Sequence, residues 1–406
     1  MEALLEQEGL SADWELIIVD DGSTDGTADV ARGYAARLDD ARADDARADV
    51  ARTDDARAYD ERATDARADD ARAYDACGDD ASTNDGLAED ARTNDGRADD
   101  GRANEPRADA ALPDKPTRLL VLTQENRGAA AARNAGVAAA EGEVLLFTDA
   151  DCRPAPGWAA ALVERLEAEP DVVAVTGLQR SDQSSVAARF VQAEYEEKQD
   201  QMVSRDAVTF LDTATAGVSA DALRRVGGFD ESLRRCEDTD LGFRLAADGG
   251  RVVVEPNAAV LHDHVTSAWR YARRKLALGY WGAGVYRLHR DMVADDSRTP
   301  WTMRAQMIAV PVLIAALLVG FVLLLLAEQL PQAWRAGAAD VTSAAWLVAA
   351  AAGAVFVVSS VTFLRYASQH GISVVLLAPF MLLLRALALT AGLGLGLAHM
   401  GRPPRD

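Results

Sequence analysis

The sequence predicts an α/β domain followed by a membrane-spanning helical region. Short apolar runs alternate with alanine-rich helices before about residue 265, which is typical of βα units on a mostly parallel sheet. Residues 305–398 are nearly free of charge, as expected for segments that lie in hydrocarbon. A tandem acidic repeat interrupts the α/β part.

The α/β prediction rests on seven consecutive segments that remain once the repeat is set aside. Apolar runs predict strands at residues 16–19, 119–122, 144–147 and 172–175, and helical patterns lie between them at residues 24–37, 129–139 and 158–168. We therefore expect the repeat to interrupt a surface crossover, where long insertions are tolerated.

The repeat has nothing to bury. Arginine recurs every five residues from position 42 to 72 and again from 92 to 107, separated by Asp and Ala. A five-residue step turns each copy by about 140° on a helix, so no face can collect like residues. We predict that the repeat is disordered and assign it no chemistry.

The sequence therefore divides into five predicted parts. They are the first part of the α/β domain (1–38), the acidic insertion (39–112), the rest of the domain (113–265), interfacial basic and aromatic helices (266–304) and three transmembrane helices (305–398).

The charge balance excludes one class of partner. Carboxylates outnumber Lys and Arg by 64 to 42, which gives a net charge of -22. Nucleic acid is therefore not an expected partner, because binding it needs a basic face. Only three of the basic residues are Lys. We interpret the Lys-poor acidity as adaptation to a high-salt cytoplasm, which predicts stability that rises with KCl concentration.

Three segments are long and apolar enough to span a bilayer: residues 305–327, 341–364 and 372–398. Basic residues cluster before the first of them, whereas the next loop carries only Arg335, so the α/β domain should face the cytoplasm and the C-terminus the outside. Residues 269–290 interleave aromatic rings with cations, which predicts helices in the membrane interface. Arg385, inside the third segment, either faces neighbouring helices or snorkels towards the interface, or it contacts a lipid phosphate.

Acidic residues follow two of the predicted strands. Asp20 and Asp21 come after the first, and Asp149 and Asp151 come after the third. Ligands of open α/β sheets bind outside the carboxyl ends of the strands, and paired carboxylates there suit a hard divalent cation. A turn or helix cap is the alternative for the first pair.

Residues 237–240 form a third acidic group, Glu-Asp-Thr-Asp, at the start of an amphipathic pattern. A helix start favours acids because of the helix dipole, which accounts for Glu237 without a function.

The residues of these motifs and their order along the chain resemble those of the family 2 glycosyltransferases of the GT-A fold. The matching stretches are IIVDDGSTDGT at 17–27, NRG at 126–128, ARNAG at 132–136, DAD at 149–151, GGFDE at 227–231 and EDTDLG at 237–242. The resemblance covers residues 16 to about 286. It implies a metal-dependent enzyme that binds a nucleotide-diphosphate sugar.

The resemblance also implies roles for single residues. Asp20 and Asp21 would contact the base and ribose of the nucleotide. Asp149 and Asp151 would form the D-x-D motif that binds Mg²⁺ or Mn²⁺ together with the diphosphate. Asp238 would be the general base that takes a proton from the acceptor hydroxyl.

For two further residues the implied role stands beside a structural explanation. Arg133 would neutralise the phosphates of the nucleotide sugar, or is an ordinary solvated helix residue. His262 falls where such enzymes often carry a histidine near the diphosphate and the metal, and an interface or surface histidine is the alternative.

We expect an inverting enzyme that moves a single sugar from a UDP- or GDP-sugar to a lipid-linked (polyprenyl-phosphate) or glycan acceptor at the cytoplasmic membrane face. A processive polysaccharide synthase is the first alternative, disfavoured because its Q-x-x-R-W motif is missing and Arg-Arg-Lys-Leu-Ala stands at 273–277. An inactive nucleotide-sugar-binding membrane protein is the second. It is favoured by the apparent absence of the first strand of the fold before Leu16, where residues 1–7 look like the end of a helix.

Overall fold

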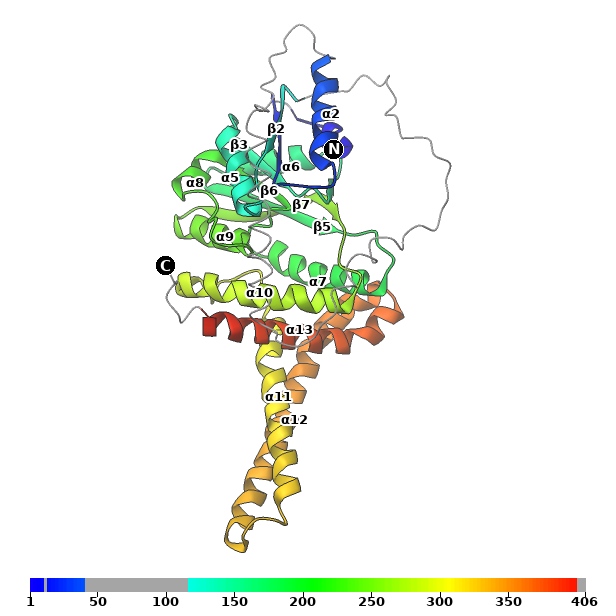
Figure 1. Cartoon of the computed structure of the whole chain (residues 1–406), viewed down its shortest axis with the longest axis vertical. Helices are drawn as coiled ribbons and strands as arrows, with labels where there is room; N and C mark the ends of the chain where they lie inside the picture. The colour runs from blue at the N-terminus through cyan, green and yellow to red at the C-terminus, as the bar shows by residue number, and fades with distance from the viewer. Residues whose placement is uncertain (11–12, 41–115, 400–406) are drawn as a thin grey trace. The chain divides into compact units, whose positions relative to one another are not determined.

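The structure is a computed structural model that describes residues 1–10, 13–40 and 116–399 (Figure 1). The chain divides into two compact units. One comprises Met1–Glu15 and Gly128–Asp406, and the other Leu16–Arg127. Nearly all of the predicted acidic insertion at 39–112 lies outside the described residues, so its disorder stays a prediction.

The smaller unit contains a two-stranded sheet of β1 (Glu15–Asp20) and β2 (Arg118–Thr123), with helix α2 (Thr27–Asp40) between them in sequence. These elements confirm the two strands and the helix predicted from apolar periodicity. Leu119, Leu120 and Val121 of β2 are buried, as expected for a continuous apolar run.

The larger unit is built on a five-stranded sheet in the order β3-β6-β5-β7-β4. Only β5 and β7 pair in parallel, whereas the other three pairings are antiparallel. The prediction of a mostly parallel sheet is therefore wrong here, because apolar runs identify strands but do not encode their direction. The strand bounds are β3 (Val144–Thr148), β4 (Cys152–Pro154), β5 (Val172–Arg180), β6 (Thr215–Ser219) and β7 (Arg251–His262).

Helices cover both faces of this sheet. Neighbouring strand residues point to opposite faces, and Ala174 and Val175 of β5 accordingly belong to two different core clusters. One cluster packs against α6 (Trp158–Ala168) through Leu162, and the other against α8 (Ala220–Arg225) and α9 (Glu237–Ala247). Each buried Val, Leu or Phe side chain in these clusters contributes about 1.5–3 kcal/mol of transfer free energy.

Two further helices and a close approach position the site. Helix α5 (Ala129–Ala139) confirms the predicted helix at these residues, and α7 (Val186–Val203) follows β5. A Cβ atom on Gly242 of α9 would lie 2.4 Å from the carbonyl oxygen of Thr209. Only glycine therefore lets α9 lie against the loop that leads into β6. The short helix α1 (Glu2–Leu5) opens the chain.

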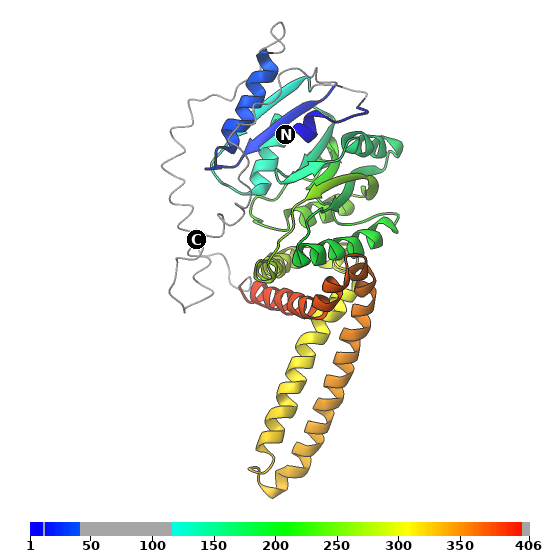
Figure 2. The same ribbon diagram turned by 90° about the vertical axis from the view of Figure 1, so that its right-hand side faces the viewer.

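The C-terminal part is helical. It comprises α10 (Ala268–Leu288), the short η2 (Arg290–Met292), α11 (Trp301–Leu326), α12 (Gln332–Gln369) and α13 (Ile372–His399). The last three are long and apolar enough to cross a membrane, with mean hydropathies of 3.0, 2.2 and 2.4. Helices α11 and α12 extend side by side away from the sheet, whereas α13 lies alongside α10 (Figures 1 and 2).

Candidate active site

Arg133 links two of the predicted acidic groups. It lies on α5, and its guanidinium donates to Asp149 Oδ1 at 2.8 Å and to Glu237 Oε1 at 2.7 Å. Asp149 follows the end of β3, and Glu237 is the first residue of α9. The Arg133 side chain is only 15% exposed. The structure therefore brings the first residue of the D-x-D motif and the start of α9 to one buried cation, and the alternative of a solvated Arg133 is wrong.

Burial and charge act in opposite directions on this cluster. Burial lowers the pKa of Arg133, but the Asp149 and Glu237 carboxylates outweigh it and raise the pKa, so the guanidinium stays charged. The pKa of Glu237 is raised, first by burial and then by the charge of Asp238, although Arg133 opposes both effects. Arg133 is thus the main group that opposes this rise in the pKa of Glu237.

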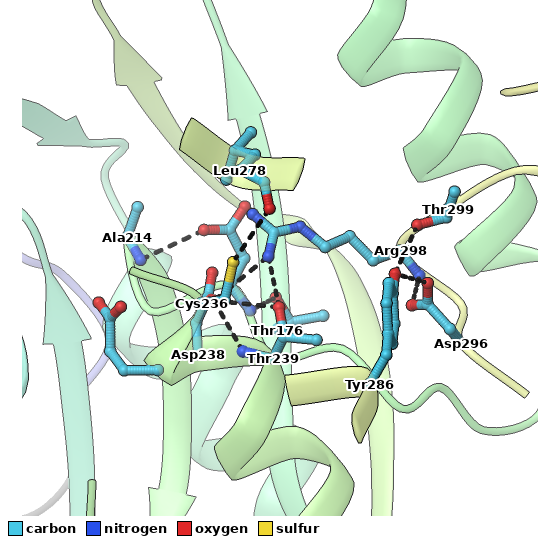
Figure 3. A network of polar contacts seen from close by, with 12 residues as sticks. Thr176, Ala214, Cys236, Asp238, Thr239, Leu278, Tyr286, Asp296, Arg298 and Thr299 are labelled. Atoms are coloured by element: carbon cyan, nitrogen blue, oxygen red, sulfur yellow. Dashed lines mark hydrogen bonds and ion pairs between the residues drawn. The ribbon is translucent and has the colours of Figure 1, made fainter. Parts of the chain in front are cut away.

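Asp238, the predicted base, is the second residue of α9. Its Oδ1 accepts from the backbone N–H of Thr239 at 2.7 Å and lies 3.4 Å from Nη1 of Arg298, which also donates to Thr239 Oγ1. Figure 3 shows Arg298 reaching Asp238 and Thr239. These contacts use Oδ1, so within residues 1–10, 13–40 and 116–399 the Oδ2 atom has no partner and can accept a proton.

The contacts of Asp240 and Arg298 hold α9 in place. Asp240 is buried and pairs with Arg244 at 2.7 Å and with His289 Nε2 at 2.7 Å. The backbone N–H of Arg298 donates to Asp296 at 2.8 Å, and Asp296 also accepts from the Tyr286 hydroxyl at 2.7 Å (Figure 3). The segment that leads into α11 thus fixes the cation beside the predicted base.

Asp151 and His262 come together at the β4–β7 pairing. Their Oδ2 and Nε2 atoms are 3.5 Å apart, and Cys152 completes a group whose ligand atoms lie within 4.8 Å of one another. The contact with His262 is the main cause that lowers the pKa of Asp151. Burial, followed by the charges of Asp149 and Asp151, raises the pKa of Cys152 to about 12. The thiol is therefore protonated as long as no cation is bound beside it.

A chain of hydrogen bonds orients His262. Gln192 donates its Nε2 to Glu196 at 3.0 Å, so its Oε1 faces His264 Nε2 at 2.9 Å and must accept. His264 then carries its hydrogen on Nε2 and accepts at Nδ1, which lies 3.3 Å from His262 Nδ1. Burial lowers the pKa of His264 to about 3, so it is neutral.

His262 must therefore carry a hydrogen on Nδ1. Its Nε2 atom faces the Asp151 carboxylate, with a lone pair if the ring is neutral and with a second proton if it is charged. A lone pair and a carboxylate repel each other at this distance unless a proton or a cation lies between them. Oxygen and imidazole donors oriented in this way fit a divalent cation. Of the predicted metal ligands, Asp151 and His262 face each other, whereas Asp149 is paired with Arg133.

Asp20 and Asp21 lie in the smaller unit, at the end of β1. Asp20 is buried and accepts from the backbone N–H of Ser23 at 3.2 Å. Asp21 accepts from the Gln124 side chain at 2.7 Å and from the backbone N–H of Arg127 at 2.9 Å. The Asp21 carboxylate thus ties together the loops that follow β1 and β2, whereas that of Asp20 holds its own loop. The nucleotide-binding role of both residues stays a prediction.

Sequence reasoning missed three charged residues close to the predicted base. The pKa of Asp212 is raised, first by burial, although Lys198 opposes this, and then by the charge of Asp238. Lys198 lies between the rings of Tyr195 and Phe210, at 4.7 and 4.6 Å. Arg298 stacks on the same Phe210 ring at 4.6 Å. None of the three lies in a recognisable motif, so no signal in the sequence could have found them.

Comparison with known proteins identifies a family and several similar proteins. Residues 1–52 and 95–227 match the family model described as glycosyl transferase family 2. The pre-mycofactocin glycosyltransferase of Mycobacterium tuberculosis is 31% identical over 175 residues, which are 42% of this chain and 37% of that protein. The succinoglycan biosynthesis protein ExoO of Rhizobium meliloti is 30% identical over 166 residues, covering 38% of this chain and 47% of its own length.

The chain thus spans less than half of the length of either relative. Among solved structures, the mannosyltransferase PcManGT from Pyrobaculum calidifontis, in complex with GDP-Man and Mn2+, aligns with 96% of this chain and 81% of its own, at 18% identity and a TM-score of 0.47. The family match spans β1 to α8 and so includes Asp20, Asp149 and Asp151. The chain therefore carries a domain that matches glycosyl transferase family 2 over residues 1–52 and 95–227 and has an α/β fold.

Proposed function

We propose that the chain is an inverting glycosyltransferase that moves a single sugar from a UDP- or GDP-sugar to a lipid-linked or glycan acceptor at the cytoplasmic face of the cell membrane. The observation that carries the proposal is the Arg133 bridge. It ties Asp149 of the D-x-D motif to the helix whose second residue is the base Asp238. The donor-binding and proton-accepting parts of the reaction are thereby held in one rigid cluster.

In this reaction Asp238 takes the proton of the acceptor hydroxyl on Oδ2. The acceptor oxygen forms a bond to the anomeric carbon while the bond from that carbon to the diphosphate breaks. Attack from the face opposite the leaving group inverts the configuration. The nucleotide diphosphate leaves with the bonding electron pair. Arg298 keeps Asp238 oriented through Oδ1, so its other oxygen is the one available to the acceptor.

A divalent cation, Mg²⁺ or Mn²⁺, would be held by Asp151 and His262, and by Asp149 once the donor diphosphate displaces part of its pairing with Arg133. It would stabilise the charge that develops on the diphosphate. An imidazole ligand favours a transition metal over Mg²⁺, so we expect Mn²⁺ to be the better activator. Arg133 would contribute positive charge to the same phosphates.

The lipid-linked acceptor is supported by position. The segment from η2 to α11 supplies Arg298 next to Asp238 and continues directly into the first apolar helix. An acceptor whose lipid tail stays in the membrane could therefore present its head group at the base. A processive synthase and an inactive nucleotide-sugar-binding protein remain the rival functions.

The test is a donor screen with the purified full-length protein in lipid nanodiscs. UDP- and GDP-sugars are supplied with Mn²⁺ and polyprenyl-phosphate-based acceptors, and release of nucleotide diphosphate and product mass are measured. One donor should give product with a single added sugar. Long products would establish the processive reading, and binding without turnover for every donor and acceptor would establish the inactive one.

The matched variants are Asp238→Asn and Asp221→Asn. Asp221 is an exposed acid on α8, with 85% of its side chain accessible, so its neutralisation should leave turnover unchanged. Asp238→Asn should retain donor binding and lose turnover by at least about a hundredfold. Unchanged turnover in Asp238→Asn would remove the base assignment.

A further inference from the structure

The C-terminal helix α13 is long and apolar enough to cross a membrane, but its contacts lie on one side. It begins next to α7, where Arg189 donates to the carbonyl oxygen of His370 at 2.8 Å and to Ser373 Oγ at 3.2 Å. The part of the larger unit that carries the five-stranded sheet, residues 128–262, is called the catalytic unit here. Helix α7 belongs to it and carries five acidic or basic residues between positions 194 and 200. The start of α13 is therefore level with the catalytic unit.

The middle of α13 is tied to the same helix. Arg385 is buried and lies 3.4 Å from Glu194 of α7, which also pairs with Lys275 of α10 at 2.5 Å. Burial opposes ionisation of Glu194, but Lys275 and then Arg385 outweigh it and lower its pKa to about 2. Arg385 thus faces a permanent negative charge on the catalytic unit. The expectation that it faces neighbouring helices is confirmed.

The end of α13 packs along α10. A Cβ on Gly392 would lie 2.1 Å from the carbonyl oxygen of Leu276, and one on Gly396 would lie 2.4 Å from that of Tyr280. Four residues along α13 thus correspond to four residues along α10, in the same direction, so the two helices run side by side. Figures 1 and 2 both show this pair lying across the line of α11 and α12.

Helix α10 cannot lie in hydrocarbon across its length. It carries Arg270, Arg273, Arg274, Lys275 and Arg287 among its 21 residues. Its later part packs on α9 of the catalytic unit, where Val285 and Phe243 share a core cluster. Charged side chains at the bilayer centre are costly, so α10 is fixed at the membrane surface. A helix that runs beside it must lie at about the same depth.

From Ser373 to Gly396 a helix rises about 35 Å, more than the roughly 30 Å thickness of the hydrocarbon. A spanning α13 would therefore place these two residues on opposite sides of the bilayer. We propose instead that α13 lies in the plane of the membrane, in the acyl chains next to the headgroups and against α10, and that only α11 and α12 cross the bilayer. The inference concerns topology and does not depend on the proposed activity.

The lipid-facing side of α13 follows from exposure. Its most exposed large apolar residues are Ile372, Leu376, Phe380 and Leu397. The first three recur every four residues, so they share one helix face, opposite the face that holds Arg385. Exposed large apolar residues are also frequent along α11 and α12. The occupant it fits is the hydrocarbon of the same leaflet, as for an interfacial helix.

Charge distribution supports the same topology. The segment after α13 contains Arg402 and Arg405, whereas the connection between α11 and α12 has no Lys or Arg and Arg335 is the single basic residue in the first turns of α12. Basic residues near helix ends favour the cytoplasmic side. A C-terminus on the same side as the catalytic unit agrees with this rule better than the external C-terminus predicted from three spans.

The first test places epitope tags on the full-length protein in cells. One tag stands at the N-terminus, one follows residue 406, and one is inserted after Gln329 in the connection between α11 and α12. Accessibility to antibody or protease from outside is then measured. We expect only the tag after Gln329 to be accessible. An accessible C-terminal tag would establish a third span, and protection of the tag after Gln329 would show that α11 and α12 do not cross; either result overturns the proposal.

The second test measures depth directly. Spin labels are attached to single cysteines in a background without native cysteines, and oxygen and nickel accessibility reports depth in nanodiscs. Along α13, labels at 376, 387 and 397 should report one shallow depth. Along α11, labels at 308, 319 and 325 provide the matched control and should report depths that differ by about 15 Å or more. A label at 387 that is deeper than those at 376 and 397 would contradict an in-plane helix.

Discussion

Replacing Arg133 by Met removes a buried charge while it keeps most of the side-chain volume. Two carboxylates then lose their cation: Asp149, which is 40% exposed, and Glu237, which is 11% exposed. Water can solvate Asp149 in the variant, but it reaches Glu237 poorly. We therefore expect most of the destabilisation to come from an uncompensated charge on Glu237.

The expected loss in the free energy of unfolding follows from the different exposure of these two carboxylates. Removing one partner of a buried ion pair typically costs about 3–5 kcal/mol. Because Asp149 is partly solvated, the lower end of that range applies, so we expect a loss of about 3 kcal/mol in the free energy of unfolding. For a domain of this size that corresponds to a fall in Tm of about 6–12 °C.

The assay is thermal unfolding of the full-length protein in detergent, followed by tryptophan fluorescence. Arg224→Met is the matched control, because Arg224 pairs with Asp221 at 3.3 Å with both side chains exposed, and such pairs contribute about 1 kcal/mol or less. Adding Glu237→Gln to Arg133→Met should recover at least half of the lost stability. A Tm for Arg133→Met equal to that of the control would refute the reasoning.

The same variant has a pH dependence of known sign. The pKa of Glu237 is raised in the folded protein by burial and by the charge of Asp238, and loss of Arg133 raises it further. The folded state then binds a proton at higher pH than the unfolded state, whose glutamate titrates near 4.5. Stability therefore rises as the pH falls from the raised pKa towards about 4.5. The Tm deficit of Arg133→Met should shrink between pH 7.5 and pH 5.

Three further outcomes are expected. Gln192→Met removes the acceptor that fixes the His264 tautomer, so the Kd for Mn²⁺, measured by calorimetry, should rise about 10–100-fold, and an unchanged Kd would exclude the orienting role. Gly392→Leu should lower Tm because its side chain would collide with the backbone of α10. Gly394→Leu should leave Tm unchanged, because a Cβ at that position has no neighbouring atom within 4 Å. Equal Tm values for the two variants would contradict the close packing. Chelation of divalent cations should abolish turnover, and Mn²⁺ should restore it better than Mg²⁺; full activity in the chelator would remove the cation from the mechanism.

The sequence predicted helices and strands correctly where an alanine-rich or an apolar pattern dominates a segment. The pattern at residues 129–139 and 158–168 predicted α5 and α6 with the bounds that the structure has. Strand β6 was missed because Thr215–Ser219 consists of small and polar residues whose burial comes from neighbours on both sides. Strand direction was wrong for most of the sheet because it depends on connections that the apolar pattern does not record.

The sequence predicted which residues belong to the candidate site, but it did not predict which of them contact each other. Asp149, Asp151, His262 and Asp238 could be selected because they stand in motifs. That Asp149 would face Arg133 while Asp151 faces His262 depends on two side chains one residue apart pointing in different directions. Such directions arise from the turn between β3 and β4, and they are a property of the folded chain.

Hydropathy fails for α13 for a related reason. A window average measures what a helix is made of, whereas the topology depends on what its two ends and its middle contact. Arg385 was the one charged residue before the end of the segment, and its polar neighbours are Gln306 of α11 at 2.7 Å and Glu194, nearly two hundred residues earlier in the chain, at 3.4 Å. An apolar helix whose single charge pairs with the catalytic unit gains that contact only if its middle stays near the membrane surface. The same pair would have to be broken, at a cost of about 3–5 kcal/mol, for α13 to reach the bilayer centre.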